Sequence, residues 1–231
     1  FHDTATTEIY TLSLHDALPI YSSESFPQDV VELQALLGPP QENQAIHAIP
    51  GEDTNVPLWI LGSSLFGAQL AAMLGLPYAF ASHFAPQQMM QAISIYRETF
   101  QPSEQLKEPY VMLGFNMIAA ETDEEADRLA SSLRRTFVNM RRGKPTQLAA
   151  PDPSFDEQIQ PHERAMLDTM LSCSAVGSPQ TVSKKLDSFI AETGADELIL
   201  SAHIFDEKAR MRSYEIAAEV RESLGAAKAA E

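Results

Sequence analysis

The chain has 231 residues, of which 44% are hydrophobic and 21% are charged, and its formal net charge at pH 7 is −16. The 32 acidic residues outnumber the 16 basic ones and would repel a phosphate backbone, which argues against a nucleic-acid partner. No apolar run is long enough to span a bilayer, so we expect no membrane contact and a cytoplasmic location. The single cysteine, Cys173, excludes an internal disulfide and predicts no metal site; we expect its side chain to be buried.

The first twenty residues differ in character from the rest. Residues 3–20, DTATTEIYTLSLHDALPI, resemble the translated adapter oligonucleotide of DNA sequencing libraries. They lack the basic start and uninterrupted apolar core of a secretory signal. The alternative interpretation is a short strand followed by a helical turn. We predict that residues 1–20 are a non-native segment.

Strand and helix signals alternate along the next hundred residues. A helix is predicted over 27–37, because Pro27 suits a first turn and Gly38-Pro39-Pro40 stops a helix. The apolar burst at 58–61 has the length of a strand buried on both faces. A polar connection with a short extended stretch at 46–49 precedes it. Further elements are a helix over 65–74 ending at Gly75, a strand over 78–81, a helix over 86–100 and a strand over 110–120.

The alternation continues to the end of the chain. Thr122 and Glu125 have the capping-box pattern and predict a helix to about residue 140. Residues 145–161 are rich in Pro, Asp and Gln and predict a loop or lid. Later elements are a helix capped by Ser178, a strand over 197–201, a helix capped by Asp206 and a frayed tail over 226–231. This alternation implies βα units and a parallel sheet, hence an α/β fold.

Six segments of the chain, taken in order, carry a family resemblance. They include WILGSS, AAMLGLPYAFASHFAP, NMIAAETDEEADRLASS, VGSPQTVSKKL, TGADELIL and HIFDEKARMRSYEIA. Together they resemble the bacterial-luciferase-like flavin monooxygenases, in particular the single-chain oxidoreductase branch, over residues 26–224. The resemblance implies a single luciferase-like domain over 21–225 and a (β/α)8 TIM barrel, a fold that typically needs about 250 residues. In the family the helix matching 27–37 follows the fourth barrel strand, so we expect the C-terminal half of a barrel.

The resemblance also implies a function. Family members bind reduced FMN, supplied by a flavin reductase using NAD(P)H, and act on a small organic substrate with O2. We therefore expect a luciferase-like flavin-dependent oxidoreductase that incorporates molecular oxygen and forms a homo-oligomer when full length. A non-catalytic flavin-binding barrel or partner subunit, and an F420-dependent hydride-transfer enzyme, remain the alternatives. For this chain we expect weak or no activity, because half a barrel leaves two open strand edges and an unclosed apolar interior.

Candidate site residues follow two of the strands. The turn Gly62-Ser63-Ser64 feeds a helix N-terminus, which offers backbone N–H groups and a positive dipole end to an anion; an ordinary βα turn with a serine N-cap is the alternative. The resemblance assigns Ser63, Ser64 and Gly67 to the flavin phosphate, with Gly67 allowing close approach. By the same resemblance, Ser82 and the catalytic candidate His83 line the flavin ring.

Other side chains carry weaker expectations. His83 either donates to a flavin oxygen, holds a substrate or is a packed structural histidine, and His203 stands in the same position after the last strand. Asn116 and Met117 are expected to face the barrel interior, with Met117 in the core and Met89 and Met90 as helix or pocket filler. The basic residues Arg134, Arg135, Arg141, Arg142 and Lys144 are interpreted as a solvated helix face.

Overall fold

The computed structural model describes the backbone of residues 25–228 and the side chains of residues 25–224. The described residues fall into two compact units, 25–58 and 59–228. The single luciferase-like domain expected over 21–225 stays a prediction. The predicted non-native segment 1–20 lies outside the described residues. Within the described part, no helix combines the length and apolar character needed to cross a membrane.

The first unit is built on helix α2 (Phe26–Leu37), which begins one residue before the predicted start. The loop after it folds back on the end of the helix, because Asp53 N–H donates to Gly38 O and Asn55 N–H donates to Leu37 O, both at 2.9 Å. The stretch 46–49 forms no strand. In this unit Val30 is buried, whereas neighbouring apolar side chains such as Val31 are exposed.

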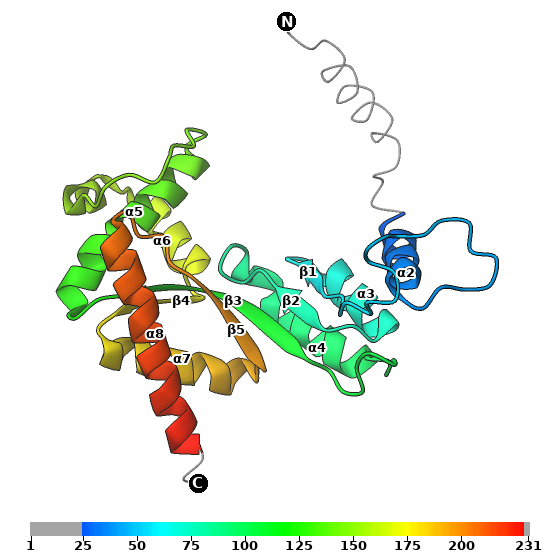
Figure 1. Cartoon of the computed structure of the whole chain (residues 1–231). Helices are drawn as coiled ribbons and strands as arrows, with labels where there is room; N and C mark the ends of the chain where they lie inside the picture. The colour runs from blue at the N-terminus through cyan, green and yellow to red at the C-terminus, as the bar shows by residue number, and fades with distance from the viewer. Residues whose placement is uncertain (1–24, 229–231) are drawn as a thin grey trace, which may run out of the picture. The chain divides into compact units, whose positions relative to one another are not determined.

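The second unit contains a parallel sheet whose longest strand is β3 (Val111–Ala119), drawn in green in Figure 1. The others are β1 (Ile60–Gly62), β2 (Tyr78–Phe80), β4 (Ser174–Gly177) and β5 (Glu197–Ser201). Strands β2 and β5 both pair with Met112 and Leu113, so they lie on opposite edges of β3. Asn116 pairs with both β4 and β5, so β4 lies on the β2 edge, further along β3.

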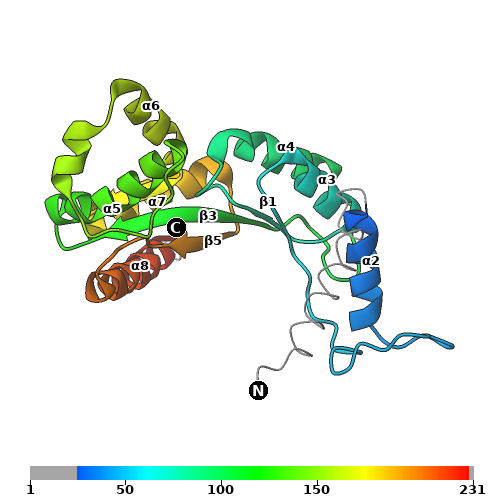
Figure 2. The same cartoon turned by 90° about the horizontal axis from the view of Figure 1, so that it is seen from above.

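Helices alternate with these strands, and their ends carry the capping groups that the sequence predicts. Thr122 accepts a hydrogen bond from Glu125 N–H at 3.2 Å, although the Glu125 carboxylate pairs with Arg128 instead of closing the capping box. Asp206 accepts from Ala209 N–H at 2.8 Å. Figure 2 shows α3 and α4 side by side. The helices are α3 (Leu65–Leu74), α4 (Met89–Thr99) after the 3-10 turn η1 (Pro86–Gln88), α5 (Asp123–Arg141), η2 (Pro153–Gln158), α6 (Pro161–Met170), α7 (Pro179–Thr193) and α8 (Glu207–Lys228).

Strand β4, the 3-10 turn η2 and helix α6 correct the sequence-based expectations. Strand β4 and helix α6 were not predicted, and η2 lies inside the expected loop 145–161. Helix α8 continues to Lys228, and residues 229–231 lie outside the described residues, so the frayed tail expected over 226–231 stays a prediction.

The two faces of the sheet differ in exposure. One face is buried under helices; for example, Phe115 packs against Phe189 of α7 with ring centroids 4.7 Å apart. On the other face Leu61 is 69% exposed and Ile199 is 57% exposed. The expectation that residues 58–61 are buried on both faces is therefore wrong. Helices cover only one face of β1 in the described part of the chain, and the face that a closed barrel would enclose is open.

The segment expected to be a loop or lid is held by a second hydrophobic core. Phe155 of η2 and Ile159 are buried against α5 and α6. Arg134 donates from Nε to Asp156 Oδ1 at 3.0 Å, and Arg142 pairs with Glu163 of α6. Arg134 is largely buried and anchors the segment, so the interpretation of the basic residues as a solvated helix face is wrong for it; Arg142 is exposed, as that interpretation expects, although it also pairs with α6.

Candidate functional site

The turn after β1 presents an uncapped helix N-terminus. Ser64 is the N-cap of α3 in an extended conformation, and its hydroxyl makes no hydrogen bond to the helix. Both Ser63 and Ser64 are exposed, and the first turn of α3 carries no acid. The first backbone N–H groups of the helix and its positive dipole end are therefore free of a charged partner. Such a terminus suits a phosphate.

Gly67 contributes differently from the way its sequence position suggests. It is buried, and a Cβ placed on it would lie 3.5 Å from the Tyr78 ring and 3.7 Å from Ile60. A side chain at this position would thus face the sheet, at ordinary contact distances, and would not face an incoming anion. What Gly67 can offer a phosphate is its backbone N–H, the third of the helix.

The turn after β2 is joined to β3 through Ser82. This serine is fully buried, and its hydroxyl donates to Gly114 O at 2.6 Å. Strand β2 pairs with β3 as far as Leu113 and β4 starts opposite Asn116, so Gly114 O lies in the gap between these two neighbours. The Ser82 hydroxyl supplies the hydrogen bond to Gly114 O that neither strand provides. The hydroxyl proton of Ser82 is already engaged in this hydrogen bond to β3. A contact between Ser82 and a cofactor stays a prediction.

His83 lies against β3 with one ring nitrogen enclosed. Its Nδ1 is buried and has no hydrogen-bond partner, and a Cβ on Gly114 would come within 1.9 Å of it. Burial lowers the pKa of His83, and the neighbouring His203 lowers it further. Burial also lowers the pKa of His203, although part of that residue is exposed. The structure thus brings together the two histidines that the sequence assigned to the same edge, both favoured in the neutral form.

Asn116, in the middle of β3, links the turn after β2 to the end of β5. It is 1% exposed, its Nδ2 donates to His83 O at 2.8 Å, and its Oδ1 accepts from Ser201 Oγ at 2.8 Å. Sequence reasoning expected Asn116 to face the interior but missed Ser201 and Gly114. A glycine inside a strand is a signal of close approach by another group, and Gly114 carried that signal.

The remaining candidates are core residues or surface residues. Met117 is fully buried, and the Met89 sulfur lies 3.8 Å from Cys173 Sγ, whereas Met90 is exposed. Cys173 is buried, as predicted, and burial raises the pKa of its thiol. A protonated thiol is a poor nucleophile. In the described part of the chain, no three His, Cys, Asp or Glu side chains are grouped as metal ligands.

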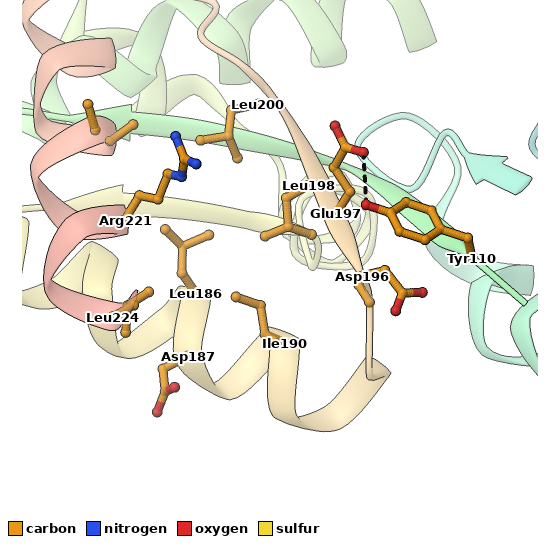
Figure 3. A pocket seen from close by; sticks show the side chains of 13 residues that line it. Tyr110, Leu186, Asp187, Ile190, Asp196, Glu197, Leu198, Leu200, Arg221 and Leu224 are labelled. Atoms are coloured by element: carbon orange, nitrogen blue, oxygen red, sulfur yellow. Dashed lines mark hydrogen bonds between the residues drawn. The ribbon is translucent and has the colours of Figure 1, made fainter. Parts of the chain in front are cut away.

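A cavity of about 920 Å³ lies elsewhere, between α7, β5 and α8 (Figure 3). Its floor is apolar, with Leu186, Leu198 and Leu200, and at one end Tyr110 donates to Glu197 at 3.4 Å. Tyr110 and Glu197 stand at the amino ends of β3 and β5. Active sites of parallel barrels form at the carboxyl ends of the strands, so we place the candidate site at His83 and not in this cavity.

These features define a parallel α/β protein with an exposed, uncapped helix N-terminus and two histidines of lowered pKa at the carboxyl edge of its sheet. Residues 21–197 match the luciferase-like monooxygenase family, and the chain belongs to that family. It is 44% identical over 202 residues to the uncharacterized protein YvbT of Bacillus subtilis (strain 168), covering 87% of this chain and 60% of that protein. It is 43% identical over 201 residues to a luciferase-like monooxygenase of Escherichia coli (strain K12), with the same coverage.

The fold comparison agrees with the family. The solved structure of apo-MsnO8 superimposes with a TM-score of 0.78 at 32% identity, covering 87% of this chain and 61% of that one. The fold class predicted from the sequence, a partial barrel of luciferase-like type with parallel strands alternating with helices, is confirmed. The chain spans about 60% of the length of the curated relatives it matches.

Proposed function

We propose that the chain is part of an FMN-dependent oxidoreductase of the monooxygenase type, which acts on a small organic substrate with O2 and reduced flavin. Family membership supports this, as does the name luciferase-like monooxygenase carried by the relative at 43% identity. The observation that carries the proposal is the exposed, uncapped N-terminus of α3 at the same sheet edge as His83. Because the chain spans about 60% of those relatives, the activity is proposed for the whole protein.

The residues present fit FMN in two places. The hydroxyls of Ser63 and Ser64 and the first N–H groups of α3 would hold the phosphate, helped by a helix-dipole contribution of about 0.3–1 kcal/mol. The link between the two turns is a hydrogen bond from Ala81 N–H to Gly62 O at 2.9 Å, so the phosphate turn and the His83 turn are neighbours. His83 would then meet the ring system or the substrate.

The protein's own task in this proposal is binding and orientation. Reduced FMN, delivered by a separate flavin reductase using NAD(P)H, would supply the electrons for oxygen chemistry when bound. Neutral His83 and His203 add no charge at the edge, and a neutral imidazole can donate or accept one hydrogen bond at each nitrogen. A homo-oligomer of the full-length protein is part of the same proposal.

The phosphate turn can be tested by comparing FMN with riboflavin, which lacks the phosphate. Hydrogen bonds to charged groups contribute about 1.5–3 kcal/mol, so Ser64→Ala should weaken FMN binding roughly 10- to 100-fold and leave riboflavin unaffected. Ser178→Ala, at the N-cap of α7, is the control, since this serine stands at the same position of its helix but its hydroxyl already accepts from Thr181 N–H. Equal affinity for FMN and riboflavin would show that the turn holds no phosphate.

Catalysis needs a separate assay on the full-length protein. We expect substrate-dependent oxygen uptake driven by NADH, FMN and a flavin reductase. Quenching of FMN fluorescence without oxygen uptake would favour a flavin-binding or partner role. Tighter binding of F420 than of FMN would favour hydride transfer.

A further inference from the structure

The His83 turn is attached to β3 at two positions, Gly114 and Asn116. Ser82 donates to Gly114 O, and Asn116 Nδ2 donates to His83 O. Side chains two residues apart in a strand lie on the same face, so the Asn116 amide and the Cβ position of Gly114 share one face of β3, which His83 covers. Ser82 holds the same turn through a backbone carbonyl at the edge of the strand. The imidazole itself rests where a side chain at position 114 would be.

The orientation of the Asn116 amide follows from its partners. A backbone carbonyl can only accept hydrogen bonds, so the group that faces His83 O must be the amide nitrogen. The amide oxygen then faces Ser201, whose hydroxyl can donate to it. Asn116 is almost fully buried, and both its partners lie at strand ends. It therefore ties the turn after β2 to the end of β5.

The enclosed Nδ1 of His83 determines which nitrogen can serve a ligand. It is buried with no acceptor in reach, and buried N–H donors without a partner are rarer than unsatisfied acceptors. The neutral ring should therefore carry its proton on Nε2. That nitrogen is then a donor available to an acceptor atom, such as a carbonyl oxygen or a ring nitrogen.

We propose that Asn116 is a positioning residue that holds His83 against Gly114, so that Nε2–H is presented to an acceptor atom of the ligand. The positioning does not depend on the identity of the ligand. That the ligand is a flavin or its substrate rests on the proposed function above. His203 also lowers the pKa of His83, so its effect has to be separated from that of Asn116.

The test is the NMR signature of the His83 ring in the flavin-free chain labelled with 15N and 13C in histidine. We expect the Nε2–H tautomer in the unsubstituted chain at pH 8. Asn116→Leu keeps a similar volume but removes both hydrogen bonds, and it should give averaged tautomers and a more mobile ring. The same comparison in a His203→Gln background removes the neighbouring titratable group.

Two serine variants separate positioning from loss of stability. Ser201→Ala should reproduce part of the change and Ser201→Thr, which keeps a hydroxyl, should restore the original signature. Ser131→Ala removes a buried serine that accepts from Asp152 N–H, so it should destabilise the chain without moving the His83 signals. If Asn116→Leu does not fold, the Ser201 pair decides. An Nδ1–H tautomer, or a signature unchanged in both Asn116→Leu and Ser201→Ala, would overturn the proposal.

Flavin titration of the same variants distinguishes this inference from the proposed function. Loss of the His83 contact should weaken FMN and riboflavin equally, by about 2- to 10-fold, the size of one net hydrogen bond. If Asn116→Leu changes the NMR signals of His83 in a chain that binds no flavin, the positioning role of Asn116 stands and the proposed flavin function is wrong.

Discussion

Arg142 and Glu163 form a bidentate ion pair, in which Arg142 Nε lies 2.6 Å from Glu163 Oε1 and Arg142 Nη2 lies 2.7 Å from Glu163 Oε2. The Glu163 carboxylate also accepts from Gln160 N–H at 2.9 Å, which closes the capping box of α6. The hydrogen bonds from Arg142 and Gln160 lower the pKa of Glu163 to about 2. The Glu163 carboxylate thus caps the N-terminus of α6 and links this helix to Arg142, the residue after α5.

This pair predicts an acid-sensitive contribution to stability. Because the pKa of Glu163 is lower in the folded chain than its ordinary value of 4.5, the stabilisation is present above that pH and is lost as the pH falls toward 2. Glu163→Gln should lower the urea midpoint at pH 7, and the difference should shrink at pH 3. Glu157→Gln, an exposed acid on η2, should change neither midpoint. A difference that is constant from pH 7 to pH 3 would contradict the assignment.

The space beside Gly114 predicts contrasting effects of two Gly→Ala substitutions. Gly114→Ala places a Cβ within 1.9 Å of His83 Nδ1, so the ring must move, at a cost of about 1–3 kcal/mol for overpacking. Gly67→Ala meets only ordinary contacts and sits inside a helix, where alanine is favoured over glycine by about 0.5–1 kcal/mol. Urea unfolding measures both. The prediction fails if Gly114→Ala is as stable as the unsubstituted chain.

How far the sequence predicts this molecule depends on the range of the interactions. Helix 65–74 and strand 197–201 have the predicted bounds, because Ser64 and Gly75 delimit the first and the apolar run defines the second. These are local signals. Helix α6 also had one, since Gln160, Pro161 and Glu163 form a capping box with proline in the first turn. This signal begins at the end of residues 145–161, which are rich in Pro, Asp and Gln and therefore predicted a loop.

The site was predictable only in outline. Residues that follow parallel strands meet at one edge, so the sequence places Ser63, Ser64, His83 and His203 at the same edge of the sheet, while their roles stay predictions. The role of Ser82 depends on the break between β2 and β4, and β4 was not predicted. The partner of Asn116 is Ser201, 85 residues away. Such a pair follows from strand register, which no local pattern in this chain specifies.

The uncapped terminus of α3 predicts opposite effects of one substitution on stability and binding. Ser64→Asp adds a negative charge at the helix N-cap, which should stabilise the chain by about 0.3–1 kcal/mol through the helix dipole. The same charge should repel a phosphate and abolish the preference for FMN over riboflavin. Thermal unfolding and fluorescence titration give the two values. Destabilisation combined with unchanged FMN affinity would mean that the terminus is neither free nor a phosphate site.

The open face of the sheet predicts self-association of the chain as it stands. Leu61 on β1 and Ile199 on β5 are exposed on this face, and within the described residues β1 pairs only with β2 and β5 only with β3. Unpaired strand edges and exposed apolar faces favour association. Leu61→Lys should therefore shift sedimentation toward the monomer while changing stability by less than about 0.5 kcal/mol.

The control for that substitution lies on a helix. Met73 of α3 is 62% exposed, close to the value for Leu61, but is not on the open sheet face. Met73→Lys adds the same charge to the same chain, so it corrects for a general gain in solubility. We expect it to leave the sedimentation profile unchanged. A chain that sediments as a monomer before any substitution, or an equal response to Met73→Lys and Leu61→Lys, would show that the open face does not drive association.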